Sequence, residues 1–288
     1  MNLLLLGNNG QLGWELQRTL QPLGVVVACD YPEVNMADSA SIRKTVRECH
    51  PDAIVNATAY TAVNRAENEP ELARAINGTG PGVLAEEALK LNAILVHFST
   101  DYVFDGTKGT PYEEIDLPRP LSVYGESKLA GEQAIQSVDG DYLIFRTAWV
   151  YSLRHDSFVS KVLEWARKNE ILRVVDDQVS NPTWARMLAE VTAQALAHDN
   201  DYLRERTGLY HLAGKGHASR YSWAKEILRL DPAKQEQKVK QLLPASTSDF
   251  PTPAQRPLFS ALECRKFEQA FDLRLPVWDA TLELALVQ

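Results

Sequence analysis

The sequence predicts an α/β protein: a doubly wound parallel sheet with a second, smaller C-terminal domain that binds the substrate. Short apolar runs without polar alternation recur between helical patterns in the first 150 residues, as is typical of strands buried on both faces of a parallel sheet. A glycine-rich turn directly follows the first run. The second half has no such turn, so we expect residues 1–150 to bind a dinucleotide and residues 151–288 to form mainly the substrate side of the cleft.

Length and composition fit a soluble enzyme. The chain has 288 residues, of which 45% are hydrophobic and 24% charged, and its net charge of −8 argues against a nucleic-acid partner. Its three cysteines have neither disulfide-framework nor metal-site spacing, which favours a reducing compartment. The apolar run at residues 3–6 is too short for a signal peptide or a membrane span, so we expect a cytoplasmic protein without a membrane partner.

The first strand is expected at residues 3–6, and a glycine turn and an amphipathic helix follow it. Gly7 permits the tight turn, Gly10 lets backbone amides approach a pyrophosphate, and Gly13 lets the helix pack close to the strand. One glycine would be enough for an ordinary strand-to-helix turn. Three at this spacing indicate a dinucleotide site.

The second expected strand, residues 25–29, ends at Asp30. A carboxylate about 20 residues beyond the glycine turn is placed to bind the adenosine ribose hydroxyls and to repel a 2′-phosphate. Because no arginine follows it, the sequence favours NADH over NADPH; the alternative is a solvated loop aspartate. Asn35 and Met36 are expected near the adenine.

A helix is expected over residues 41–50 and a third buried strand over residues 53–56. The small residues at positions 57–61 follow at the strand end, where an open parallel sheet keeps its ligands, and could pack against the nicotinamide ribose. Residues 67–91 have a mostly helical pattern, which the glycines at 78–82 could interrupt.

The fourth strand is expected at residues 93–98, with Ser99 and Thr100 directly after it. A hydroxyl at this strand end would lie across the crevice from the helix that begins near Tyr124. Thr100 could therefore hydrogen-bond the same substrate oxygen that Tyr124 protonates. His97, inside the strand, is expected to be a packed core residue rather than a ligand.

Tyr124 and Lys128 are four residues apart in a helical pattern, so their side chains are expected on one helix face. The Lys128 ammonium would then lower the pKa of the Tyr124 phenol toward neutrality. Such a phenol could pass a proton to a carbonyl oxygen while hydride reaches the carbon. Tyr221 and Lys225 share the Y-x-x-x-K pattern but follow no strand ending in Ser or Thr, so only the first pair is expected to be catalytic.

A fifth strand is expected at residues 142–147, and Trp149 lies just beyond its end. Trp149 could stack on a sugar or form a wall of the nicotinamide pocket, and burial in the core is the equal alternative. Further on, we expect a helix at 158–169, an extended segment at 171–175, a loop at 177–184, a second helix ending near residue 197 and a short strand at 208–212.

Longer strings extend these motifs: H-F-S-T-D-Y-V-F-D-G, V-Y-G-E-S-K-L-A-G-E, F-R-T-A-W-V-Y, D-D-Q-V-S-N-P-T and P-T-P-A-Q-R-P. Together with the glycine turn, they resemble the extended short-chain dehydrogenase/reductases that act on nucleotide sugars, and among them the reductases of dTDP-4-dehydrorhamnose. The resemblance covers nearly the whole chain. It implies a Rossmann-type domain that binds NADH or NADPH, and a smaller domain that binds a dTDP-sugar and returns some segments to the sheet. The implied reaction reduces the C4 ketone of dTDP-4-dehydro-L-rhamnose to dTDP-L-rhamnose.

Residue roles follow from the same resemblance. Thr100, Tyr124 and Lys128 match the catalytic trio, with Tyr124 as the proton donor. The resemblance implies cofactor contacts at Gln11, Leu12, Asp30, Ala59, Tyr60, Thr61, Phe98 and Lys128. The other expected cofactor-binding positions are Gly7, Gly10, Gly13, Asn35, Met36 and Tyr124. The implied substrate-binding positions are Thr100, Asp101, Tyr124, Trp149 and Arg256, the last of which could meet the diphosphate.

The sequence differs from some members of this family at the positions that bind a metal and form a dimer. Some members form a dimer bridged by magnesium through carboxylates. Glu15 is present here, but Arg186 stands where those members carry a glutamate, and a cation would not take a guanidinium into its ligand shell. We therefore expect no metal site, and a monomer or at most a weak homodimer.

Two kinds of alternative function remain open. Another nucleotide-sugar 4-ketoreductase, an epimerase or a dehydratase would share the fold and the Tyr–Lys pair. Dehydratases of this group usually need Asp-Glu after the threonine, whereas Tyr102 follows Asp101 here. A non-catalytic regulatory subunit could bind a dinucleotide, but it would have no need of a tuned phenol.

Overall fold

Six parallel strands form the central sheet of the computed structural model, which describes residues 1–287. Their order is β10-β5-β4-β3-β1-β2. The strands are β1 (Asn2–Leu6), β2 (Val25–Cys29), β3 (Ala53–Asn56), β4 (Ile94–Thr100), β5 (Tyr142–Thr147) and β10 (Gly208–His211). Every neighbouring pair is parallel, so the expected doubly wound α/β class is confirmed. The winding reverses between β1 and β3, and such a reversal opens a ligand crevice at the carboxyl ends of the strands.

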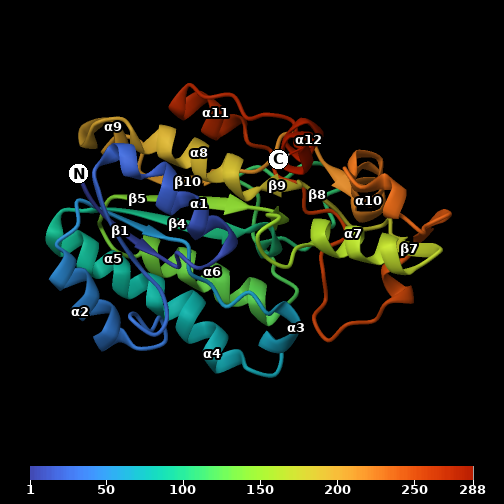
Figure 1. The fold of residues 1–288 in the computed structure, drawn as a ribbon. Helices are drawn as coiled ribbons and strands as arrows, with labels where there is room; N and C mark the ends of the chain where they lie inside the picture. Colours follow the sequence, from blue (N-terminus) through green and yellow to red (C-terminus); the bar gives the residue numbers. More distant parts are fainter. Residues whose placement is uncertain (288) are drawn as a thin grey trace.

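Helices cover both faces of this sheet (Figure 1). One face carries α1 (Gln11–Thr19) and α8 (Ala185–Leu196), and the other carries α2 (Ser39–Cys49), α5 (Gly80–Leu91) and α6 (Val123–Gln136). Successive side chains of a strand point to opposite faces. In β1, Leu3 and Leu5 therefore join the core under α1 and α8, while Leu4 and Leu6 join the core under α2 and α5.

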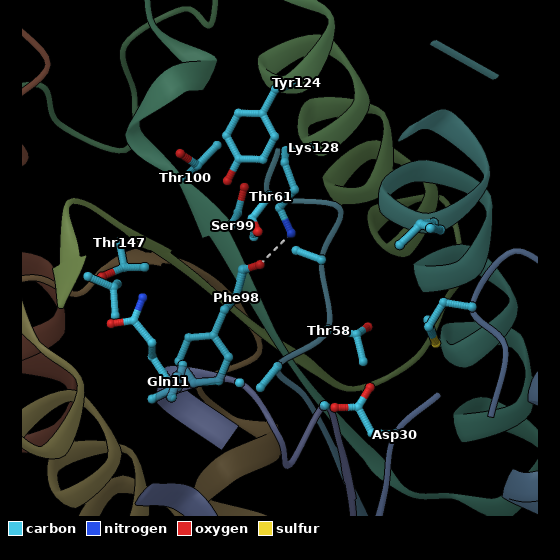
Figure 2. A pocket seen from close by; sticks show the side chains of 18 of the residues that line it. Gln11, Asp30, Thr58, Thr61, Phe98, Ser99, Thr100, Tyr124, Lys128 and Thr147 are labelled. Carbon is cyan, nitrogen blue, oxygen red and sulfur yellow. Dashed lines mark hydrogen bonds between the residues drawn. The ribbon is translucent and has the colours of Figure 1, made fainter. Parts of the chain in front are cut away.

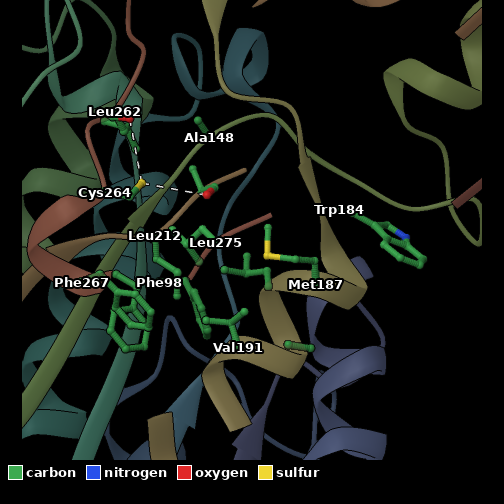
Figure 3. Packing of buried hydrophobic residues seen from close by; sticks show 14 of the residues in the cluster. Phe98, Ala148, Trp184, Met187, Val191, Leu212, Leu262, Cys264, Phe267 and Leu275 are labelled. Carbon is green, nitrogen blue, oxygen red and sulfur yellow. Dashed lines mark hydrogen bonds between the residues drawn. The ribbon is translucent and has the colours of Figure 1, made fainter. Parts of the chain in front are cut away.

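The larger of the two cores joins the sheet to the C-terminal part of the chain. Figure 3 shows Phe98 of β4 packed with Val191 of α8, Leu212 and Phe267. The thiol of Cys264 is buried in the same core, 3.9 Å from the Leu262 carbonyl oxygen. Because segments far apart in the sequence share one core, the two halves of the chain are packed together on one side of the sheet.

The second lobe is built from helices and two-stranded pairings. It contains α7 (Phe158–Lys168), α10 (Arg220–Leu230), the pair β7 (Ile171–Val175) and β12 (Gln241–Ala245), the pair β8 (Val179–Ser180) and β11 (Ala218–Ser219), and the pair β6 (Val150–Tyr151) and β9 (Thr183–Trp184). The expectation of a loop at 177–184 was incomplete, because β8 and β9 lie within it. Two-residue strands leave no readable periodicity in a sequence.

The helical stretch at 67–91 is interrupted, as its glycines predicted. α4 (Pro70–Arg74) leads into a π-helical turn, Ala75–Thr79, before α5. A Cβ on Gly80 would lie 2.7 Å from the backbone oxygen of Met36, so only glycine fits this close approach. The remaining helices are α3 (Val63–Ala66), α9 (Asn200–Arg204), α11 (Arg265–Phe271) and α12 (Trp278–Val287). None of the helices in residues 1–287 has the length and apolar character needed to cross a membrane.

Candidate active site

A cavity of about 660 Å³ lies at the carboxyl ends of the central strands (Figure 2). In Figure 2 it runs from Asp30 at one end to Thr100, Tyr124 and Lys128 at the other. The predicted residues that line it are Gly7, Gly10, Gln11, Leu12, Asp30, Asn35, Met36, Ala59, Thr61, Phe98, Thr100, Asp101, Tyr124, Lys128 and Trp149. They come together because parallel strands deliver their carboxyl ends to one edge of the sheet.

The glycine turn forms one wall of this cavity. Gly7 has a positive φ of +86°, and a Cβ there would lie 2.9 Å from the backbone of Ala57. A Cβ on Gly13 would lie 1.9 Å from the carbonyl oxygen of Gly7, so Gly13 permits the expected close packing of α1 on β1. Gly13 does not line the cavity, so it supports the turn from behind, and a direct contact of Gly13 with the cofactor stays a prediction.

Tyr60 is also outside the cavity lining. Its hydroxyl donates to Glu69 at 2.5 Å, and its backbone N–H donates to Asn77 Oδ1 at 2.8 Å. These bonds hold the segment after β3 against the π-helical turn. Tyr60 thus fixes the backbone beside Ala59 and Thr61, which do line the cavity. The cofactor contact expected of Tyr60 itself stays a prediction.

Buried polar atoms without partners show what this cavity can accept. Gln11 Oε1 and Thr147 Oγ1, which belong to residues of the cavity lining, have no hydrogen-bond partner among residues 1–287. An unsatisfied buried polar group costs about 1–3 kcal/mol. With the glycine cradle and the N-terminus of α1, these atoms fit a polar ligand that carries a pyrophosphate and ribose hydroxyls.

Asp30 is fixed at the far end of the cavity. One carboxylate oxygen accepts from the N–H of Asn9 at 3.1 Å, and the other accepts from the N–H of Tyr31 at 2.8 Å. These bonds favour the ribose-binding interpretation over that of a freely solvated loop aspartate.

Tyr124 reaches the cavity from the first turn of α6. Ser122 caps this helix by accepting from the N–H of Gly125 at 3.2 Å. The Tyr124 ring lies edge-on to that of Tyr102, with their centroids 5.7 Å apart. Burial raises the pKa of Tyr124 well above its ordinary value, and a hydrogen bond with the Thr100 side chain acts in the opposite direction.

The expected effect of Lys128 on Tyr124 is wrong. Lys128 Nζ donates to the carbonyl oxygen of Phe98 at 2.6 Å and lies 3.2 Å from His97 Nε2. The ammonium is thus directed at the strand and not at the phenol (Figure 2). Burial lowers the pKa of Lys128 to about 8, opposed by the charge of Glu132. Tyr124 is therefore strongly held in its protonated form, the form of a proton donor.

Asp101 ties the end of β4 to the second lobe. Its carboxylate accepts from Ser260 at 2.5 Å, Ser180 at 2.9 Å and Thr100 at 3.2 Å. Burial raises the pKa of Asp101 to about 6, against the effect of these hydrogen bonds. Because its oxygens are already used, Asp101 positions Thr100 and joins the two halves of the cleft, whatever contact it also makes with substrate.

A second cavity of about 530 Å³ adjoins the first, and Gln11, Trp149 and Val150 line both. Trp149 stacks on Trp223, with centroids 5.5 Å apart and an interplanar angle of 12°. The guanidinium of Arg220 lies 3.6 Å from the centroid of the Trp149 ring. Trp149 has a φ of +41°, and such strained conformations cluster at functional sites. The wall interpretation of Trp149 is favoured over simple burial.

Four cationic side chains line the second cavity: Lys161, Arg173, Arg220 and Arg256. Burial lowers the pKa of Arg220 to about 10, against the effects of Tyr102 and Asp101. Arg256 lies 3.4 Å from Asn64 Oδ1, and Arg173 is paired with Asp249 at 2.7 Å. The cavity therefore has the charge needed to bind a diphosphate.

Known proteins resemble this chain over its whole length. A family model described as "RmlD substrate binding domain" matches residues 1–288. The dTDP-4-dehydrorhamnose reductase of Burkholderia thailandensis is 40% identical over 287 residues, covering 96% of this chain and 95% of its own. That of Salmonella typhimurium is 42% identical over 295 residues, covering 100% and 98%. The chain belongs to the dTDP-4-dehydrorhamnose reductase family.

Solved structures agree with the family assignment. The dTDP-4-dehydrorhamnose reductase from Clostridium acetobutylicum superposes with a TM-score of 0.92 at 34% identity, covering 100% of this chain and 99% of that one. The Bacillus anthracis reductase, solved in complex with NADP, gives 0.90 at 32% identity, covering 99% and 98%. A UDP-glucose 4-epimerase from Thermus thermophilus, 22% identical with a TM-score of 0.81 over 100% of this chain and 98% of that one, shares the fold alone. The predictions of the family and of an oxidoreductase are confirmed.

In this member of the dTDP-4-dehydrorhamnose reductase family, guanidinium groups neutralise the carboxylates near Glu15. Arg18 lies 3.2 Å from Glu15 and 3.3 Å from Glu190, and Arg186 lies 3.2 Å from Glu190. Within residues 1–287 there is no group of three His, Cys, Asp or Glu side chains placed to hold a metal ion. The expectations of no metal and of a monomer or weak homodimer stay predictions.

Sequence reasoning missed several residues of the two cavities. In the first cavity these include Ser99, Thr147 and His155; in the second, they include the cations Lys161, Arg173 and Arg220. Thr147 ends β5, so the rule that ligands bind at the carboxyl ends of strands could have found it. Arg220 opens a helix after a two-residue strand, and no local pattern marks it.

Replacing Asp30 by Asn should shift cofactor preference toward NADPH. The amide keeps an oxygen for the N–H of Asn9 but removes the charge that would repel a 2′-phosphate. The ratio of kcat/KM for NADPH to that for NADH should rise by roughly tenfold or more, since about 1.4 kcal/mol of repulsion equals a tenfold difference in affinity. An unchanged ratio would show that Asp30 does not face the ribose.

Proposed function

We propose that this protein reduces the C4 ketone of dTDP-4-dehydro-L-rhamnose to dTDP-L-rhamnose with NADPH or NADH. The observation that carries the proposal is the pairing of a protonated Tyr124 with Thr100 inside the first cavity, beside a second cavity lined by cations. The first cavity fits a dinucleotide and the second a nucleotide sugar. Tyr124 and Thr100 form the reducing centre, in the first cavity beside the second.

The first cavity is assigned to the nicotinamide dinucleotide. Gly7 and Gly10 would admit its pyrophosphate, and Asp30 its adenosine ribose. The relative from Bacillus anthracis was solved with NADP, which supports this class of cofactor. When bound, the reduced cofactor supplies a hydride to the ketone carbon.

Tyr124 is assigned as the proton donor to the ketone oxygen. Its raised pKa keeps the proton on the phenol until the developing alkoxide takes it. Thr100 hydrogen-bonds the phenol and is itself held by Asp101 and by the N–H of Tyr102. Thr100 therefore orients the acid, and its hydroxyl lies close enough to meet the same substrate oxygen.

The second cavity is assigned to the dTDP portion of the substrate. Trp149, Phe158 and Trp223 offer aromatic faces for the base or the sugar, while Arg220 and Arg256 offer guanidinium groups for the diphosphate. Because the cofactor is assigned to the first cavity and the dTDP portion to the second, the second lobe, and not the glycine turn, would select the substrate.

Replacing Arg256 by Gln should weaken substrate binding without affecting the cofactor. A hydrogen bond to a charged group is worth about 1.5–3 kcal/mol, so the KM for the dTDP-sugar should rise roughly 10- to 100-fold. The Kd of NADPH, measured by fluorescence titration, should stay unchanged because Arg256 does not line the first cavity. A weakened NADPH affinity with an unchanged KM for the sugar would contradict the assignment.

Absorbance of the reduced cofactor tests the proposed reaction directly. The enzyme is incubated with NADPH or NADH and dTDP-4-keto-6-deoxyhexose, with and without the 3,5-epimerase that would act before it. Consumption of one reduced cofactor per product, dependent on the epimerase, supports the proposal. Turnover with a retained, recycled cofactor would instead indicate an epimerase or dehydratase. Binding without turnover would indicate a regulatory subunit.

A further inference from the structure

The loop between β6 and α7 carries side chains of the second lobe to the edge of the first cavity. It spans residues 152–157, and its two end residues, Ser152 and Ser157, are buried. The Ser157 hydroxyl donates to the carbonyl oxygen of Ser152 at 2.9 Å, which ties the two ends together. The tip of this loop, residues 153–156, is exposed. A loop whose ends are joined presents its tip in a defined position.

Arg154 connects this tip to the first turn of α1. Its guanidinium lies 4.1 Å from the centroid of the Trp14 ring, a distance at which a cation is attracted to an aromatic face. Trp14 follows Gln11 by three residues, so the two are neighbours on one side of α1. Because Gln11 lines the first cavity, Arg154 holds the tip beside that cavity.

The next two side chains of the tip lie at different cavities. His155 lines the first cavity but not the second, whereas Asp156 lines the second but not the first. The tip therefore lies at the boundary of the two cavities, like Gln11 and Trp149, which line both. The imidazole is placed on the cofactor side, and the carboxylate of its neighbour is kept away from it.

Few lining side chains of the first cavity could balance the charge of a pyrophosphate. Of these residues, all within positions 1–287, only Lys128 and His155 can carry positive charge. Lys128 Nζ donates to the carbonyl oxygen of Phe98 at 2.6 Å, and it lies at the opposite end of the cavity from Asp30 (Figure 2). His155 is therefore the lining side chain that can bring positive charge to the glycine turn.

The N-terminus of α1 favours an anion in the same part of the cavity. Its N-cap, Gly10, has no side chain to accept from the first N–H groups of the helix, and the first turn holds no acidic residue. Such free N–H groups attract negative charge. Gln11 Oε1, in this turn, is buried without a partner among residues 1–287. A pyrophosphate bound here would lie near both the N–H groups of α1 and the imidazole of His155.

We propose that His155 is a cofactor-binding residue, whose imidazole donates a hydrogen bond to the pyrophosphate of the nicotinamide dinucleotide. Arg154 and Trp14 are positioning residues, which hold the tip where His155 can donate. The second lobe thus binds the cofactor as well as the substrate. This inference rests on the proposed assignment of the first cavity to the dinucleotide.

His155→Ala tests the contact without an assay of activity. The Kd of NADPH, from fluorescence titration of the full-length protein, should rise roughly tenfold, as expected for the loss of one charge-assisted hydrogen bond. The Kd of ADP, measured by displacement of NADPH, should rise by the same factor, because ADP keeps the diphosphate and lacks the nicotinamide. His155→Arg, which restores a cationic donor, should bind NADPH within about threefold of the wild type.

Lys161→Ala is the matched control. Lys161 is another cation of the second lobe, but it lines only the second cavity, so its loss should leave the Kd of NADPH within about twofold of the wild type. An equal increase in both alanine variants would attribute the effect to overall charge and overturn the contact. An unchanged Kd in His155→Ala would also overturn it. Weaker binding of NADPH but not of ADP would exclude the pyrophosphate as the group that His155 contacts.

Trp14→Leu tests the positioning role of the Arg154 contact. We expect the Kd of NADPH to rise about threefold, and the double variant with His155→Ala to bind no more weakly than His155→Ala alone, since the contact acts through His155. Independent, additive losses would overturn the positioning role. If the wild type binds no NADPH, the cavity assignment fails and this inference with it. If the wild type binds NADPH and His155→Ala binds it equally well, this inference alone fails.

Discussion

Replacing Tyr124 by Phe should lower kcat by about 10²- to 10⁴-fold, the contribution of a positioned general acid. The change removes only the hydroxyl, and the ring keeps its edge-on contact with Tyr102. Cofactor affinity should change little, because the glycine turn and Asp30 are unaffected. Steady-state oxidation of NADPH and fluorescence titration of the cofactor measure the two quantities separately.

Tyr221→Phe is the matched control for this experiment. Tyr221 shares the Y-x-x-x-K pattern but lies on α10, where its hydroxyl is 3.4 Å from the Leu242 carbonyl oxygen, and it lines neither cavity. Its replacement should leave kcat within about twofold of the wild type, as expected for a residue that touches no reacting group. Full turnover in Tyr124→Phe would refute the role of Tyr124 as the acid.

Replacing Arg146 by Leu should destabilise the fold by about 3–5 kcal/mol, the cost of leaving a buried charge without its partner. Arg146 of β5 contacts Glu132 of α6 through two hydrogen bonds of 2.9 and 2.6 Å, and the two side chains are 4% and 1% exposed. Without Arg146, only the Ser99 hydroxyl would remain on the Glu132 carboxylate. Urea denaturation gives the free energy of unfolding.

Lys240→Leu provides the comparison for an exposed ion pair. Lys240 and Glu170 lie 2.8 Å apart, but their side chains are 70% and 66% exposed. Solvent screens such pairs, so the free energy of unfolding should change by less than about 1 kcal/mol. Equal effects of Arg146→Leu and Lys240→Leu would show that burial does not determine how much the Arg146–Glu132 pair contributes to the free energy of unfolding.

The elements that position the site were predictable from short-range patterns. Strands β2, β3, β5 and β7 have the bounds expected from their apolar runs, and α6 begins one residue before Tyr124. The predictions of β3 and β5 succeeded because a strand buried on both faces needs an unbroken apolar run. The turn was predictable because a dinucleotide turn needs glycine. Gly13 shows the limit: its spacing predicted close packing of the helix on the strand, but only the fold shows that the atom approached is the carbonyl oxygen of Gly7.

Local sequence patterns could not predict where a side chain points or which residues distant in the sequence contact each other. Tyr124 and Lys128 lie on one helix, as their spacing required, yet Lys128 points to Phe98 and His97 because those groups lie beneath α6 in the folded sheet. Arg220 reaches Trp149 only because the second lobe folds over the end of β5.

The sequence by itself determined the sheet class, the dinucleotide turn and the residue types of the reducing centre, because each depends on neighbours within a few positions. The tertiary structure alone decided which protons those residues hold. Burial shifts the pKa values of Asp101, Tyr124 and Lys128, and at Asp101 hydrogen bonds from Ser180 and Ser260, which are distant in the sequence, oppose that shift. No local pattern records either effect.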